Sequence, residues 1–266
     1  MLRVATAFIR RDFLIFTSYR MAFAWQFVTM IGGTIALSFV GVIAQGSMGD
    51  VLAPYGASYF AFILVGFGFL QFLGAASSAC NDAVREGQTT GTLEVILTSP
   101  HRIPTILLGS SGFYILYGMM RLLLVFAAGH LLFKLWGQIN YGAALGTLLI
   151  CAVCFSAIGL IGSAFTLAFK RGDPVLGIYG LLNAALGGLI FPVQLLPSWL
   201  RPFAALLPLT HALEAMRLAL NNASLAAIIP SWAALLLLSA VLLPSGGALF
   251  WLAYNYARDR GSLVQY

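Results

Sequence analysis

The residues best suited to polar chemistry in this chain gather in one stretch between two long apolar runs. Charged residues make up only 8% of the sequence, yet Asp82, Arg85, Glu86 and Glu94 lie within thirteen positions. Carboxylates in such a cluster can accept hydrogen bonds from a basic partner or cap a helix. We interpret the stretch as the place where a membrane protein meets a soluble partner.

The motifs that most enzymes would need are missing from the sequence. It contains no Gly-x-x-x-x-Gly-Lys-Ser/Thr phosphate loop and no His-Glu-x-x-His pair, and its three histidines belong to three separate segments. Cys151 and Cys154 have the spacing of a redox or metal pair, but they lie in an apolar run without a second pair, which favours small core residues. We therefore predict no catalytic residue, no metal site and no cofactor bound by this chain.

The composition indicates a bilayer protein. The chain is 61% hydrophobic with a mean hydropathy of +0.94, whereas soluble domains carry about 25% charged residues. The net charge of +6 does not indicate nucleic-acid binding, because the basic residues lie mainly at the ends of apolar runs. At about 20 residues per span, 266 residues suffice for roughly six spans.

We predict an all-α, polytopic membrane protein, with residues 1–266 forming a single transmembrane domain. An amphipathic N-terminal helix over 1–20 would lie in the membrane interface. Six apolar runs are predicted to span the bilayer: 21–45, 57–80, 103–133, 141–169, 174–196 and 231–256. Of the 14 lysines and arginines, ten would be cytosolic, three would be outside and one, Arg121, lies in a span, so both termini are predicted to be cytosolic.

The outer segment 197–230 has an unusual pattern. It continues the apolar run, yet four prolines lie within it or just before it: Pro192, Pro197, Pro202 and Pro208. Prolines break helix interiors, and irregular backbone at membrane depth must be buried in protein or line a cavity. We expect re-entrant helices at the outer mouth of a pathway; the alternative is an amphipathic helix over 209–220 on the outer surface.

Arg121 is the one charged residue that the sequence places well inside a predicted span, and no aspartate or glutamate is expected among the spans. Two interpretations stay open for Arg121: it snorkels or pairs structurally, or it belongs to a pathway. In the cytosolic segment 82–101, Gly87 and Gly91 are expected to interrupt any continuous helix. A short amphipathic helix would follow and end before Pro100, although an ordinary interfacial loop is the alternative.

Two motifs resemble those of type-2 ABC exporter permeases. The first is Glu86-Gly87, then Gly91-Thr92-Leu93-Glu94 and Thr98-Ser99-Pro100 in the cytosolic segment, which departs from the family at Gln88-Thr89-Thr90. The second runs from Phe191-Pro192 through Leu196-Pro197-Ser198-Trp199-Leu200 to the stretch from Pro208 to Arg217. Together with the six spans, they extend the resemblance over nearly the whole chain.

The resemblance implies a homodimer, or a close heterodimer, that docks two ABC ATPase subunits, which would bind ATP and Mg²⁺. It assigns the main coupling helix to Glu86, Thr92, Leu93, Glu94 and Pro100. It assigns a smaller contact to Lys170, Arg171 and Asp173. Together with the intramembrane charge, it gives these candidates for the pathway or outer gate: Arg121, Phe191, Pro192, Pro197, His211, Glu214 and Arg217.

The resemblance also favours a drug, antibiotic, lipid or other amphipathic cargo, and a bacterial cytoplasmic membrane as the location. The alternative within the same architecture is export of a polysaccharide or glycolipid. Alternatives from other classes are an ion-coupled secondary transporter, disfavoured by the lack of intramembrane carboxylates, and an integral membrane enzyme or a non-transporting assembly subunit.

Overall fold

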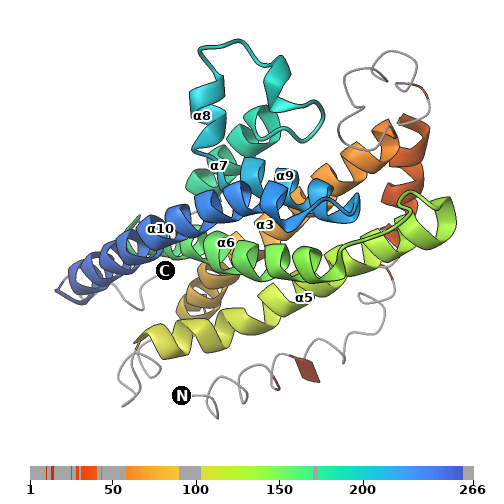
Figure 1. Cartoon of the computed structure of the whole chain (residues 1–266). Helices are drawn as coiled ribbons and strands as arrows, with labels where there is room; N and C mark the ends of the chain where they lie inside the picture. The colour runs from red at the N-terminus through yellow and green to blue at the C-terminus, as the bar shows by residue number, and fades with distance from the viewer. Residues whose placement is uncertain are drawn as a thin grey trace.

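The computed structural model of the chain describes residues 10, 13–14, 25, 28–29, 31–40, 43, 58–89, 103–169 and 173–259. Within these ranges the regular elements are helices, which confirms the all-α prediction (Figure 1). The four longest are α3 (Tyr59–Thr89), α5 (Ile103–Phe133), α6 (Tyr141–Phe169) and α10 (Leu225–Asp259).

All four are long and apolar enough to cross a hydrocarbon core of about 30 Å. The candidate spans are Tyr59–Arg85, Ser111–Phe133, Tyr141–Phe169 and Leu225–Arg258. Two shorter apolar helices, Ile31–Val40 and Pro174–Leu186, accompany them. The described residues thus hold four long spans, and a total of six stays a prediction. Most of the predicted interfacial helix over 1–20 lies outside the described residues.

The most enclosed of the long helices is α3. Of its most apolar stretch, 72% is buried inside the chain, against 22% for α10. Gly129 of α5 packs against Leu64, and Gly118 packs against Ala75, so α5 runs antiparallel to α3. By contrast, α6 runs parallel to α3, and α10 runs parallel to α6. Successive spans must alternate in direction, so this order requires α7 (Asp173–Leu186), between α6 and α10, to return toward the other side of the bilayer.

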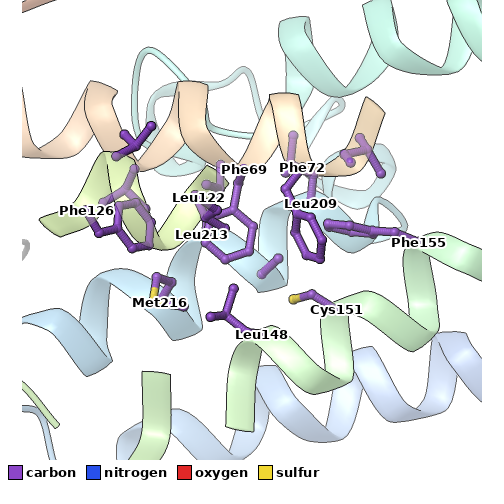
Figure 2. Packing of buried hydrophobic residues seen from close by; sticks show 14 of the residues in the cluster. Phe69, Phe72, Leu122, Phe126, Leu148, Cys151, Phe155, Leu209, Leu213 and Met216 are labelled. Carbon is purple, nitrogen blue, oxygen red and sulfur yellow. The ribbon is translucent and has the colours of Figure 1, made fainter. Parts of the chain in front are cut away.

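Large apolar side chains fill the space between α3, α5 and α6. Phe72 and Phe155 have ring centroids 5.6 Å apart and lie near Leu209 (Figure 2). Cys151 and Cys154 are free and fully buried in this cluster, which confirms them as small core residues. Because lipid tails are as apolar as these side chains, close packing rather than escape from water holds such helices together.

Glycines permit close helix approach at some positions of the bundle and not at others. A Cβ on Gly159 would lie 2.7 Å from the carbonyl oxygen of Ser77, so α6 and α3 touch through backbone here. A Cβ on Gly146 would lie 2.9 Å from the Trp232 ring, and a Cβ on Gly162 would lie 2.7 Å from the Leu176 side chain. A Cβ on Gly177 or Gly180 would have no described atom within 4 Å beyond its chain neighbours and the nearby backbone of its own helix.

Between α7 and α10 the chain forms three short elements: η2 (Val193–Leu195), α8 (Arg201–Ala205) and α9 (Pro208–Leu220). In Figure 1, α8 stands off from the long helices while α9 lies among them. Pro202 and Pro208 lie in the first turns of α8 and α9, where a proline costs no hydrogen bond. These two prolines therefore start helices.

The end of α3 differs from expectation. The helix continues through Gly87 to Thr89, so the prediction that Gly87 interrupts it is wrong. A single glycine costs a helix only about 1 kcal/mol relative to alanine, and the 28 preceding helical residues carry the helix past it. Gly91 lies outside the described residues.

Candidate functional site

One half of the bundle is built around α9. Nine of the thirteen residues of this helix are buried, and the helix packs against α10, α6 and α3. Its first turn places Leu209 beside Phe155, about 20 Å along α6 from the start of that helix (Figure 2). Its last turn reaches the α5–α6 connection, where the Asn140 N–H donates to the Ala219 carbonyl at 3.0 Å. A helix with this burial is not an amphipathic helix on the outer surface.

Arg217 joins α9 to two other parts of the chain. Its guanidinium donates from Nη1 to the Gly188 carbonyl at 3.0 Å, and from Nη2 to the carbonyls of Phe62 at 3.0 Å and Leu189 at 3.4 Å. The guanidinium carbon also lies 3.3 Å from the centroid of the Phe62 ring, and Arg217 is only 6% exposed. One side chain thus holds the buried helix against the start of α3 and the turn after α7.

The backbone at this turn suits the contact. Gly188 has a φ of +77°, a conformation that residues with a Cβ rarely adopt. A Cβ on Gly66 of α3 would lie 2.5 Å from the Leu189 carbonyl oxygen, so that glycine lets the turn approach the helix. Two glycines therefore allow the carbonyls to reach the guanidinium.

The other polar residues of α9 face different neighbours. Ser231 of α10 donates to Glu214 Oε2 at 3.4 Å, which places a carboxylate among the packed helices. Glu214 belongs to α9 and not to one of the candidate spans, so this carboxylate enters the bundle from a shorter helix. His211 Nε2 donates to the Ala205 carbonyl at 2.8 Å and Thr210 Oγ1 to that of Ala204, also at 2.8 Å, which ties α9 to α8.

The prolines and Phe191 do not form one cluster with Arg217. Phe191 is half-buried and Pro192 is buried, next to η2, while Pro197 is exposed in the following turn. Arg201 folds this turn by donating to the carbonyls of Leu196 at 2.9 Å and Gln194 at 2.7 Å. The structure therefore separates Pro197 from the buried contacts of α9.

Arg121 lies elsewhere, at the wall of a cavity between α3, α5 and the helical residues near Ile31–Val40. Its Nη2 donates to Gln71 Oε1 at 2.9 Å, and its guanidinium carbon lies 5.9 Å from the centroid of the Tyr117 ring. Gln71 lies twelve residues after the start of α3, or about 18 Å along it. The guanidinium pairs with the neighbouring helix at this depth, near the middle of both spans.

The cavity beside Arg121 has a volume of about 340 Å³ and is partly open. Most of its wall is apolar or glycine, and four polar side chains interrupt that wall. Its lining comprises Thr29, Gly33, Thr34, Ala36, Leu37, Leu64, Phe67, Gly68, Gln71, Arg121 and Val125. It has the size and the mixed wall of a small-molecule site.

Most of the predicted coupling residues lie outside the described residues: Thr92, Leu93, Glu94, Pro100, Lys170 and Arg171. Glu86 belongs to the last turn of α3, and Asp173 is the first residue of α7. Val84 of α3, Leu167 of α6 and Ala257 of α10 share one core cluster. The helix ends that flank both predicted contacts therefore lie at the same end of the bundle.

Some polar contacts escape sequence analysis because their partners are far apart in the chain. Thr166 donates to Asn81 across the α6–α3 packing, and Trp232 Nε1 donates to Thr147 Oγ1 at 2.9 Å. The sequence does mark Gln71, because a polar side chain in the middle of an apolar run of a membrane helix is a candidate functional residue. No sequence feature marks Phe62, because its backbone carbonyl, and not its side chain, accepts the hydrogen bond from Arg217.

These features define an integral membrane protein whose long helices enclose a shorter buried helix. A family model described as ABC-2 family transporter protein matches residues 44–244. The chain belongs to this family and is a membrane permease component of an ABC-2 type transporter. The match confirms the resemblance, and permeases of this kind generally work with ABC ATPase subunits. No curated protein matches the chain.

Proposed function

We propose that two copies of this chain form the pathway of an ATP-driven exporter that moves amphipathic molecules out of the cell across a bacterial cytoplasmic membrane. The observation that carries the cargo class is the cavity of about 340 Å³ beside Arg121, whose wall combines apolar side chains with an amide, two hydroxyls and a guanidinium. Such a wall suits a molecule with an apolar body and a polar end. Polysaccharides, which present hydroxyls along their whole length, match it less well.

In this proposal α9 is a re-entrant helix that closes the outer mouth. Its burial among α3, α6 and α10 and the Arg217 contacts with Phe62 and Gly188 support that role. Because one guanidinium links three parts of the chain, release of α9 would require breaking its contacts together. The residues proposed for the gate are Phe191, Pro192, His211, Glu214 and Arg217, with Pro197 in the exposed turn that follows.

The ATPase would dock at the opposite end. There Glu86, Thr92, Leu93, Glu94 and Pro100 form the proposed main contact, and Lys170, Arg171 and Asp173 the smaller one. Support comes from the flanking helix ends, since α3, α6 and α10 bring Val84, Leu167 and Ala257 together at this end. ATP and Mg²⁺ would be bound by the partner.

The first test is purification of the tagged protein from its native membrane in mild detergent, with mass spectrometry of what accompanies it. We expect an ABC ATPase in stoichiometric amount. Glu94→Arg is expected to lower its recovery by about tenfold or more, because a buried like-charge contact costs more than 1.4 kcal/mol. Asp259→Arg, the same charge reversal at the last residue of α10, is the matched control and should retain the ATPase.

Recovery of the protein alone, under conditions that preserve ABC complexes, would refute the proposal. The rival would then be ion-coupled transport, for which Glu214 is the carboxylate placed among the helices. Proton-driven uptake or efflux in vesicles that is lost in Glu214→Gln would identify that rival.

A further inference from the structure

The charge at the cavity wall is balanced by no acidic side chain among the residues that the structure describes there. Arg121 donates one N–H to Gln71, which is neutral, and its remaining described contact is the Tyr117 ring. None of the described residues that line the cavity is an aspartate or glutamate. A guanidinium carries five N–H donors and stays charged, so most of its donors have no partner among the described residues.

The position of this charge makes the lack of a carboxylate costly. Gln71 and Arg121 both lie about 18 Å from the nearer ends of their helices, at Tyr59 and Phe133. Charged side chains at such depth are rare, and they pair with an opposite charge or face a water-filled cavity. Arg121 faces a cavity, and that cavity is where a counter-charge fits.

The rest of the wall indicates what would carry the counter-charge. Leu37, Leu64, Phe67 and Val125 present apolar surface to the same space. A small inorganic anion would leave this surface in contact with water, whereas a molecule with an anionic head and an alkyl or aryl body would cover it. Guanidinium binds carboxylate, sulfate and phosphate groups through paired N–H donors, with a geometry that an ammonium cannot reproduce.

We infer that the cavity between Ile31–Val40, α3 and α5 binds the anionic head of an amphipathic molecule, with Arg121 as its charge partner. This inference deepens the proposed export function and rests on it for the fate of the bound molecule. The shared chemistry is an oxyanion on an apolar body, which either a membrane lipid or a transported solute can supply.

The test is photolabelling of the purified protein in phosphatidylcholine nanodiscs, without ATP or ATPase, by a sixteen-carbon fatty acid that carries a diazirine. The matched probes are the corresponding primary alcohol and the trimethylammonium derivative. We expect the acid to label peptides of α3 and α5 at least about tenfold more than the other two probes, which corresponds to about 1.4 kcal/mol. Unlabelled tetradecanoate should compete and tetradecanol should not.

Four variants separate charge recognition from a structural role. Arg121→Gln removes the charge, and Gln71→Glu keeps the arginine but neutralises it with a carboxylate, so both should lose about tenfold of the labelling. Gln71→Leu leaves the charge available and should label within about twofold of the natural sequence. Arg258→Gln, at an exposed arginine of the last helix, is the control for a loss of one positive charge and should label normally.

Equal labelling by the acid and the alcohol would overturn the inference, as would normal labelling of Gln71→Glu together with loss in Gln71→Leu. Gln71→Glu retains the guanidinium and decides the matter even if Arg121→Gln does not fold. Nanodiscs with phosphatidylglycerol distinguish the two sources, because loss of labelling there assigns the site to the membrane's own anionic lipid, and retention assigns it to a single-chain solute. The labelling requires no ATPase, so it can hold even where co-purification fails and the exporter proposal falls.

Discussion

The Arg217 contacts lead to a prediction about stability that the structure makes quantitative. Arg217→Met keeps an unbranched apolar stem and removes every side-chain N–H donor. The carbonyls of Gly188 and Leu189 then lose a buried partner, and so does the ring face of Phe62. We expect the substitution to destabilise the packing of α9 against α3 and the turn after α7.

The expected magnitude follows from the two shorter hydrogen bonds, both 3.0 Å long. A hydrogen bond from a charged donor contributes about 1.5–3 kcal/mol in a protein interior. Polar contacts between membrane helices measure about 0.6 and at most about 1.7 kcal/mol, because the unfolded chain also finds partners. Taking about 1.5 kcal/mol for each bond predicts a loss of about 3 kcal/mol, and Arg217→Lys should lose about half of that, since an ammonium lacks the planar fork.

The assay is reversible unfolding by dodecyl sulfate in mixed micelles, followed by circular dichroism. Arg201→Met is the control, because Arg201 also donates to two carbonyls, those of Leu196 and Gln194, but is exposed. Water can replace donors there, so its loss should be under about 1 kcal/mol. Equal losses of unfolding free energy for Arg217→Met and Arg201→Met would refute the argument that burial makes the Arg217 hydrogen bonds the more stabilising ones.

Two further predictions concern helix packing. Gly159→Ala should destabilise the fold by about 1–3 kcal/mol in the same assay, because its Cβ would lie 2.7 Å from the Ser77 carbonyl oxygen and the helices must separate. Gly74→Ala, in α3 with open space around it, should be neutral or slightly stabilising, and a comparable loss there would contradict the packing argument. A membrane-permeant maleimide should not label the folded protein in mild detergent but should label it after denaturation by dodecyl sulfate, because all three cysteines are buried: Cys80, Cys151 and Cys154. Rapid labelling of the folded protein would show that the core opens.

Much of the fold could be predicted from local sequence, because apolar runs of about 20 residues can satisfy their backbone in lipid only as helices. Four such runs are long helices in the structure, and α3 and α5 run antiparallel as two successive spans must. Helix ends were harder to predict. Thr89 ends α3 beyond Gly87, and Pro202 and Pro208 lie in the first turns of α8 and α9, because glycine and proline have effects that depend on the helix around them.

The candidate site could be predicted as a set of residues but not as an arrangement. One short segment supplies three of the predicted site residues: His211, Glu214 and Arg217. In the structure each has a different partner, namely Ala205, Ser231 and Phe62, respectively. Arg121 was recognised as an unusual charge, but its pairing with Gln71 was not predicted. Partner choice depends on how helices pack, and spacing along one segment does not encode it.

By itself the sequence determined that the chain is a helical membrane protein of a recognisable transporter family, since composition, apolar run length and two motifs are local properties. Only the tertiary structure decided that α9 lies inside the bundle and that Arg217 reaches the Phe62 carbonyl, 155 residues earlier in the chain. Likewise it placed Arg121 at the wall of a cavity without an acidic residue among its described lining. The physical reason is that a buried polar group takes its partners from whichever backbone the packing brings within about 3 Å.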